Sequence, residues 1–406
     1  MKTYLLATTM LIGLGLPMIA SAQDAAPAAT VADDTTEVVV TGFRSSLQKS
    51  INLKKEAIVV RDSIVAEDIG KFPEANVAEA LQRIPGVYLT RDGQSNEGQR
   101  ISIRGLGPEY NVTTLNGAPV HVTSSTNVGG SSRDFNYDVF ASELFGRVDF
   151  YKTPLAELEE GGVGGVVDLQ TPRPFDGGGK QVMRYGASAS YNTASEHVDP
   201  NLFALYSNTW GDWGFLIGAA HSTSVNMKSG FEATGGYNSS YLANHANSLG
   251  SGPFGFALDW DDPRAAGMLS NRTAIDNAFL PRFYRYYGAE NTRDRDGLVS
   301  SVQYKHDRLN VSLDMLYSHL TDSRDEFTFG LPIRNSRTTN TAARPGTAGH
   351  NGFVPIDVSI DPDGNLLEGT FGNTSYLGES YYYNDETRFG YASLNGTYQL
   401  SDSLKL

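Results

Sequence analysis

The sequence predicts an α+β domain followed by an antiparallel transmembrane β-barrel, of which only about the first six to seven strands are present. Residues 43–172 mix short helix and strand patterns. Residues 173–406 form the barrel part, in which apolar and polar side chains alternate with a period of two from Gln181 onward, in stretches near the ~9–11 residues that a tilted strand needs to cross a bilayer. The connections between these stretches are alternately short and long, as in outer-membrane barrels, whose long loops face the outside of the cell.

Composition excludes several classes of protein. The chain has a net charge of −14, which repels phosphate backbones and makes nucleic acid an unsuitable partner. It has no cysteine, so disulfides and thiolate chemistry are excluded. No zinc-protease, serine-hydrolase or phosphate-loop motif is present. We therefore predict no enzymatic activity, no metal site and no cofactor.

The N-terminus has the pattern of an export signal. Lys2 precedes an apolar run over residues 5–19, and Ala20-Ser21-Ala22 forms a small-residue cleavage site. A membrane anchor is the alternative, but the run is shorter than the ~20 residues that a spanning helix needs. We predict a signal peptide over residues 1–22 and a mature chain that starts at Gln23.

A flexible tail and a short β-prone box follow the signal. Residues 23–36 are rich in Ala, Asp and Thr and bury too little apolar surface to fold. The box has three consecutive valines, which favour an extended backbone. It can add a strand to the sheet edge of a partner, or it can be the first strand of the next domain. Its residues are Glu37, Val38, Val39, Val40, Thr41 and Gly42.

Within the α+β domain, helices are predicted over residues 45–57 and 76–84, the second capped by Asn76 with Glu79 three residues later. Asn116-Gly117 is typical of a hairpin turn. Arg104 fits either a surface position at a strand end or a buried ion pair. The glycine-rich run 161–165 lacks the Lys-Ser/Thr of a phosphate loop, so we interpret it as a tight turn. Strands are predicted over residues 58–60, 101–105, 147–151 and 166–169.

Six stretches of period-two alternation make up the barrel part, with a seventh strand starting at Leu404. Tight turns at residues 210–212 and 306–308 contrast with two connections of several dozen residues. A soluble sandwich or propeller is the alternative, but its loops would be more even in length. The stretches are residues 181–191, 202–209, 213–222, 298–305, 309–318 and 388–400.

The two long connections contain the candidate ligand contacts. Aromatic faces there could stack on sugar rings, or they could serve loop packing or an interfacial belt. The acidic group around Asp261 fits a cation site or, by default, a solvated loop. Residues 361–365 resemble the start of a calcium loop but lack its glycine, so a hairpin turn is predicted. The aromatic candidates are Trp260, Tyr284, Tyr286 and Tyr382.

Six motifs, in this order, resemble the TonB box and plug domain of TonB-dependent receptors. They are the 37–42 box, AEALQRIPGV (78–87), ISIRGLG (101–107), LNGAPV (115–120), RVDFYKTP (147–154) and GGVGGVVDLQTPRP (161–174). Longer segments at 66–87, 133–145 and 155–165 resemble the large branch associated with glycan uptake. The plug residues that these motifs single out are Arg104, Gly105, Asn116, Gly117, Gly164 and Gly165.

This resemblance implies an importer in the outer membrane of a Gram-negative bacterium. The implied partners are the inner-membrane TonB–ExbB–ExbD energy-coupling complex, which would bind the 37–42 box, outer-membrane lipid, and a scarce solute. An oligosaccharide is the expected solute and an iron chelate is the alternative. A passive porin and a secreted carbohydrate-binding protein are the alternatives from other classes. Because plugged barrels need about 22 strands to close, we expect these 406 residues to be the N-terminal part of a longer chain.

Overall fold

The computed structural model describes residues 43–65, 76–93, 95–122, 133–233, 236–238, 258, 260–281, 283–332, 354–372, 374, 376–401 and 404–405. The predicted signal peptide, the tail and the 37–42 box lie outside these residues. No helix that the structure describes has both the length and the apolar run that crossing a membrane would require.

The α+β domain is built on a five-stranded sheet with the order β1-β6-β7-β4-β5. Its strands are β1 (Arg61–Val65), β4 (Asn111–Leu115), β5 (Ala118–Pro119), β6 (Arg147–Tyr151) and β7 (Gly165–Gln170). All pair antiparallel except β4 and β7, which are parallel. Helix α1 (Phe43–Glu56) precedes β1, and both helix and sheet agree with the predicted class.

A hairpin and a short helix complete this domain. Strands β2 (Val87–Arg91) and β3 (Gly98–Ile103) pair antiparallel, and helix α3 (Val77–Leu81) packs on them. Asn76 caps α3 as predicted, since its side chain accepts a hydrogen bond from the Glu79 amide. Short 3-10 turns η1 (Pro108–Tyr110), η2 (Tyr137–Val139), η3 (Ser142–Leu144) and η4 (Pro174–Gly177) connect the elements. The buried core includes Leu81, Ile101, Ile103, Phe140, Leu144 and Phe150.

One strand prediction in this domain was wrong. The apolar run 58–60 forms bends, and β1 instead occupies the more polar segment Arg61–Val65. Asp62 is buried there because Lys54 and Lys152 each approach one of its oxygens to 2.6 Å. Ser63 donates a hydrogen bond to Asp149 on β6. Partners from distant segments thus override the local hydropathy pattern.

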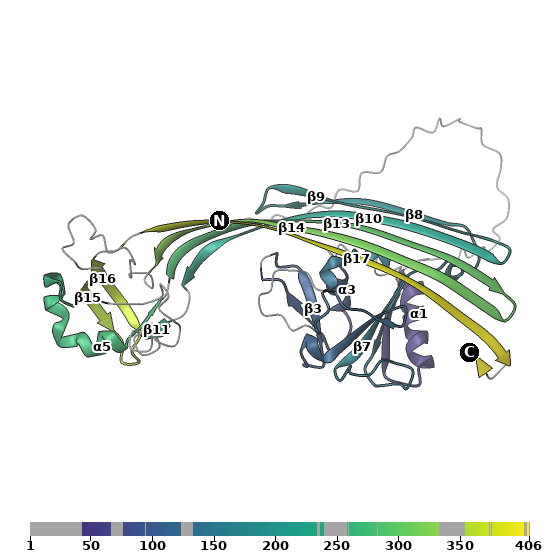
Figure 1. Cartoon of the computed structure of the whole chain (residues 1–406), viewed down its shortest axis with the longest axis horizontal. Coiled ribbons are helices and arrows are strands. Elements are labelled where there is room, and N and C mark those ends of the chain that lie inside the picture. Colours follow the sequence, from purple (N-terminus) through teal and green to yellow (C-terminus); the bar gives the residue numbers. More distant parts are fainter. Residues whose placement is uncertain are drawn as a thin grey trace, which may run out of the picture. The chain divides into compact units, whose positions relative to one another are not determined.

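The second part of the chain is a seven-stranded sheet with the order β18-β17-β14-β13-β10-β9-β8, antiparallel throughout (Figure 1). Tight turns join β9 to β10 and β13 to β14, as predicted. Among the described strands, β8 and β18 are the two edges of an open sheet. The strands are β8 (Val182–Asn192), β9 (His197–Trp210), β10 (Trp213–Ala233), β13 (Phe283–His306), β14 (Leu309–Pro332), β17 (Leu377–Ser401) and β18 (Leu404–Lys405). Strand β8 has nearly the predicted bounds, whereas β9, β10, β13, β14 and β17 are much longer than predicted.

The two faces of this sheet differ, and the α+β domain identifies them. We call the side that contacts that domain the inner face; it carries the even positions of β10 and β14 and the odd positions of β13 and β17. Leu316, Ser318 and Leu320 of β14 are buried on it. The outer face carries the alternate positions, among them Leu313 and Met315, which remain 39 % exposed.

The long connections contain folded segments with a small core of their own. The first contributes β11 (Gly236–Asn238), η5 (Pro263–Asn271), α5 (Arg272–Asn277) and β12 (Phe279–Pro281), and the second contributes β15 (Val354–Ile360) and β16 (Leu366–Gly372). β15 and β16 form a hairpin, and residues 361–364 make the predicted turn with Gly364 at φ 86°. Buried side chains from both connections pack together, namely Trp260, Ala265, Ile275, Val354 and Val358.

Candidate functional site

A buried charge cluster joins the α+β domain to the sheet. Arg293 and Arg295 project from the inner face of β13, and each is only 1 % exposed. Arg293 lies 3.1 Å from Glu97, 2.7 Å from Asp138 and 3.0 Å from Asp322. Glu97 stands at the end of the β2–β3 hairpin turn and also pairs with Arg295. The cluster therefore holds the hairpin and the η2 turn against the sheet through charge-assisted contacts.

The protonation state of Glu97 depends on these arginines. Burial by itself would raise the pKa of this carboxyl group. The positive charges of Arg295 and Arg293 outweigh the effect of burial and lower the pKa to about 2. Glu97 is therefore ionised at any physiological pH, and the cluster keeps its charges.

Other contacts along the inner face also hold the α+β domain against the sheet. Arg173 pairs with Asp314 of β14 at 2.7 Å. Ser318 donates a hydrogen bond to the Val139 carbonyl at 2.7 Å, and the rings of Phe140 and Phe389 meet edge to face. Because both polar and apolar contacts recur over several strands, many buried groups hold the domain against the sheet, and the charge cluster is one of them.

A second group of side chains lies on the inner face between the charge cluster and the long connections. The Arg324 guanidinium stacks over the Tyr383 ring at 4.1 Å, and the rings of Tyr381 and Tyr383 lie 6.2 Å apart. Arg285 pairs with Glu379 at 2.9 Å and also with Glu232. We call Arg285, Tyr287, Arg324, Tyr381 and Tyr383 the vestibule group. It presents two half-exposed tyrosine rings beside two arginines.

The residues predicted to contact a ligand lie outside the vestibule group, on the outer face of the sheet or in the small core of the long connections. Tyr284, Tyr286 and Tyr382 all occupy outer-face positions, since Tyr284 and Tyr286 share that face with Phe231 and Tyr382 alternates with the inner-face rings on β17. Trp260 is buried at 8 % exposure in the small core, with its indole N–H donating to Asp276 at 3.0 Å. The sequence thus located the aromatic clusters, while the vestibule rings are their immediate neighbours on the other face.

The predicted plug residues fall at tight backbone positions of the α+β domain. Arg104 and Gly105 form a turn with positive φ of 57° and 77°, and the Arg104 side chain is exposed. Asn116 and Gly117 form the predicted hairpin turn, with φ of 51° and 84°. The Gly117 amide donates a hydrogen bond to the Asp168 carboxylate, and the Asn116 side-chain oxygen accepts one from the Thr171 amide.

Gly164 and Gly165 lie where a side chain would collide with the fold. A Cβ at Gly164 would stand 2.3 Å from the Asn111 side-chain oxygen, and one at Gly165 would stand 2.9 Å from the Tyr151 carbonyl. These glycines therefore allow the 161–165 connection to enter β7 against β4 and β6, which agrees with the predicted tight turn.

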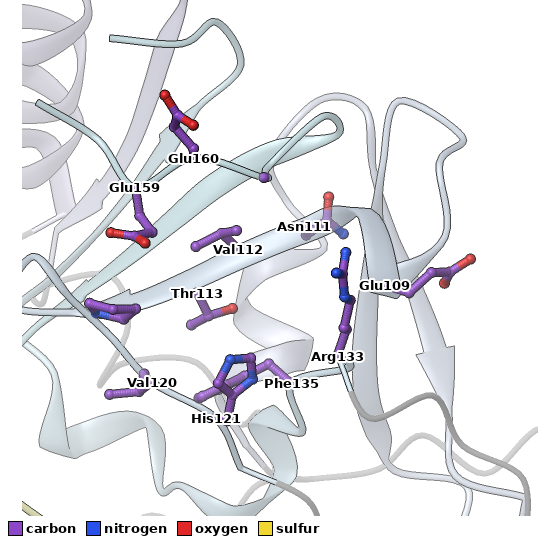
Figure 2. Close-up of a pocket in the computed structure, with 12 residues that line it drawn as sticks. Glu109, Asn111, Val112, Thr113, Val120, His121, Arg133, Phe135, Glu159 and Glu160 are labelled. Atoms are coloured by element: carbon purple, nitrogen blue, oxygen red, sulfur yellow. The ribbon is translucent and has the colours of Figure 1, made fainter. Parts of the chain in front are cut away.

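A pocket of about 370 Å³ lies on the α+β domain (Figure 2). Val112 and Thr113 of β4 form its floor, and His121, Arg133, Glu159 and Glu160 surround it. Its three glutamates outnumber its one arginine, so the pocket disfavours an anionic ligand. No group of three or more acidic or histidine side chains within the described ranges is arranged to hold a metal ion.

Comparison with known proteins identifies the first domain. Residues 54–166 match the family model described as the TonB-dependent Receptor Plug Domain. The chain is 32 % identical over 200 residues to the Ferrienterobactin receptor of Escherichia coli (strain K12), covering 47 % of the chain and 24 % of that receptor. It is 38 % identical over 123 residues to the Ferric enterobactin receptor PirA of Pseudomonas aeruginosa, covering 28 % of the chain and 16 % of that receptor.

A solved structure of the ferric enterobactin receptor PfeA aligns with 83 % of this chain and 46 % of its own, at 15 % identity and a TM-score of 0.36. The chain matches about a quarter or less of the length of the two curated receptors. By the family-model match, residues 54–166 belong to a plug domain, and an antiparallel seven-stranded sheet follows it.

Sequence reasoning missed Arg293 and Arg295 because strand four was predicted to start near residue 298. The available signal was the alternation Arg293, Asp294, Arg295, Asp296, which puts two arginines on one face and two aspartates on the other. Such an alternation fits a strand with one face buried against a polar partner and the other face in water.

Proposed function

We propose that this chain is part of a TonB-dependent receptor that imports an iron chelate across the outer membrane. The observation that carries the proposal is the joint match of the plug domain to its family model and of the longer alignment to two ferric enterobactin receptors. These relatives favour the iron chelate, which was the alternative expectation, over the oligosaccharide. Ferric enterobactin is accordingly the first ligand to test.

The arrangement of the sheet and the plug supports a gated route. The plug is bound to the inner face by the charge cluster, so it obstructs the space that a closed barrel would enclose. The 37–42 box lies outside the described residues and, by its three valines, remains the proposed point at which the TonB complex adds a strand and pulls. We propose that this pull separates plug contacts while the sheet stays in place.

The vestibule group is the proposed ligand contact. Its tyrosine rings can stack against ring systems of a chelate, and the buried Nε of Arg324 makes no hydrogen bond among the described residues. The carboxylates of Glu232, Glu326 and Glu379 share this surface, so we expect the rings, rather than net charge, to provide most of the affinity.

Neighbouring tyrosines on β17 provide a matched test. Tyr383→Ala removes an inner-face ring, and Tyr382→Ala removes the adjacent outer-face ring. Removal of an aromatic contact residue typically costs about 2 kcal/mol, so we expect roughly 30-fold weaker ferric enterobactin binding for Tyr383→Ala and no change for Tyr382→Ala. Fluorescence titration of the receptor with ferric enterobactin and with a panel of oligosaccharides measures both. Tight binding of an oligosaccharide and none of the iron chelate would reverse the proposed substrate.

A further inference from the structure

Asp322 lies at the junction between the plug and the sheet, on the inner face of β14. It follows residue 318, where the predicted bilayer-crossing stretch of this strand ends. The side chain is 8 % exposed, and one of its oxygens accepts a hydrogen bond from the Asn291 side-chain amide at 2.7 Å. Its other oxygen lies 3.0 Å from Arg293. Asp322 is therefore a member of the charge cluster that the sheet, and not the plug, contributes.

The charges around Asp322 do not balance. The plug hairpin brings two buried carboxylates to the junction, Asp92 at 3 % and Glu97 at 4 % exposure. On the sheet, Asp385 of β17 is the direct cross-strand partner of Asp322 on the same face, and like charges in this arrangement destabilise a strand pair. Within the described part of the chain, two guanidiniums, Arg293 and Arg295, thus meet five carboxylates, namely Asp92, Glu97, Asp138, Asp322 and Asp385.

Two further cations near the junction have partners of their own. Arg324 follows Asp322 on the same face of β14 but pairs with Glu326 at 3.3 Å. Lys228 of β10 is exposed and donates a hydrogen bond to the Gly93 carbonyl of the hairpin turn at 2.7 Å. The negative charge at the junction is therefore compensated chiefly by the two buried arginines.

These surroundings favour the neutral form of Asp322. Burial is the largest cause that raises the pKa of its carboxyl group above the ordinary value of 3.8. The negative charges of Asp92 and Glu97 raise the pKa further, while Arg293 and the Asn291 amide oppose the rise without cancelling it. Arg293 opposes it only partly because Asp322 shares this guanidinium with two other carboxylates. Since Asp92 and Glu97 belong to the hairpin, ionised Asp322 repels the hairpin and neutral Asp322 does not.

We propose that Asp322 makes the contact between the plug hairpin and the sheet sensitive to pH: a proton on this side chain stabilises the contact, and release of the proton to water weakens it. A carboxyl group with a raised pKa in the folded state contributes stability that is complete below its ordinary pKa of 3.8. This stability is lost as the pH rises through the folded pKa.

Glu97 acts in the opposite direction, because its pKa is lowered to about 2. The hairpin is therefore held most firmly in mildly acidic surroundings, where Asp322 is neutral and Glu97 is ionised. This inference concerns the plug contact alone, so it holds whichever solute the receptor imports.

Hydrogen exchange of the β2 and β3 amides in the folded protein, measured from pH 4.5 to about pH 8 and corrected for intrinsic exchange rates, tests the proposal. It gives the equilibrium constant for hairpin opening. We expect this constant to rise with pH by up to about tenfold per pH unit, which is the slope for release of one proton. Asp322→Asn cannot ionise, so its opening constant should not vary with pH. At the upper end of the range it should be roughly 1.4- to 5-fold below that of the unaltered protein, because the repulsion by Asp385 is gone.

Asp138→Asn separates the charge of Asp322 from a general loosening of the cluster. Asp138 is fully buried and pairs with Arg293 at 2.7 Å, so this variant should open more readily at every pH while a pH dependence remains. Asp385→Asn should move the midpoint of the pH dependence to lower pH, which a purely structural role of Asp322 would not produce, and it serves as the test if Asp322→Asn does not fold. An opening constant that stays the same over the whole pH range in the unaltered protein would overturn the inference, as would an unchanged pH dependence in Asp322→Asn.

Discussion

Replacement of Glu97 by glutamine should release the β2–β3 hairpin of the plug from the sheet. Glu97→Gln keeps the size of the side chain but removes the only carboxylate that the structure shows paired with Arg295 among the described residues. Arg293 keeps Asp138 and Asp322, whereas Arg295 keeps, within the described part of the chain, only the Asp138 carbonyl. The substitution thus leaves a guanidinium that is 1 % exposed without a charged partner.

Breaking a buried ion pair by removing one partner typically costs about 3–5 kcal/mol. We therefore expect opening of the hairpin to become roughly 150- to 4,000-fold more favourable in Glu97→Gln. Hydrogen exchange of the β2 and β3 amides in the folded protein measures this opening directly. The control is Glu79→Gln, which removes the half-exposed pair with Arg91 and should cost about 0–1 kcal/mol.

The double variant E97Q/R295Q tests whether the charges of Glu97 and Arg295 depend on each other. It removes both charges of the pair, so it should cost less than the sum of the two single changes. Protection factors of Glu97→Gln within threefold of the unaltered receptor would refute the argument that the cluster holds the plug. Additive costs in the double variant would show that Glu97 and Arg295 act independently.

The same cluster predicts an acid response. The pKa of Glu97 is about 2 in the folded protein and lies below its ordinary value of 4.5, so the unfolded state binds the proton more readily. The stabilisation is therefore complete above about pH 4.5 and decreases as the pH falls towards 2. Hairpin exchange should accelerate over this range in the unaltered receptor, and this part of the acceleration should be missing in Glu97→Gln.

Two further predictions concern the plug and its tether. Gly164→Ala should lower the free energy of unfolding of the plug by about 1–3 kcal/mol in a denaturant titration, because the new Cβ would lie 2.3 Å from the Asn111 side chain. The control Gly93→Ala has open space around it and should change this free energy by less than about 0.5 kcal/mol. Equal effects of the two substitutions would contradict the packing argument. Val39→Pro should abolish uptake and leave ferric enterobactin binding intact, because proline cannot donate to a strand ladder, and normal transport by this variant would show that the box is not the coupling strand.

The plug could be predicted closely from the sequence because its signals are local. The strand Arg147–Tyr151, the cap at Asn76 and the turn at Asn116-Gly117 each depend on a few adjacent residues. Strands β2 and β4 were not predicted at all. The first strand is displaced, since Asp62 is stabilised there by lysines from two other segments. A local hydropathy pattern contains no information about such partners.

The extents of the barrel strands could not be predicted for a physical reason. Strand four was predicted to begin near residue 298, where apolar outer-face side chains start to alternate with polar inner-face ones, although β13 begins at Phe283. Over residues 290–296 both faces carry polar side chains, so the period-two signal disappears there. Because neighbouring residues of a strand point to opposite faces, this also hid which tyrosines face inward, Tyr381 and Tyr383 rather than Tyr382.

The central claim is energised import of an iron chelate, and uptake of radiolabelled ferric enterobactin by whole cells tests it most directly. Cells that make the receptor would be assayed at equal surface expression with and without a protonophore, beside cells that lack the receptor. We predict receptor-dependent accumulation that stops when the protonophore removes the inner-membrane proton gradient, while binding at the cell surface persists. Accumulation that continues at the same rate without the gradient would contradict energised import and indicate a passive pore.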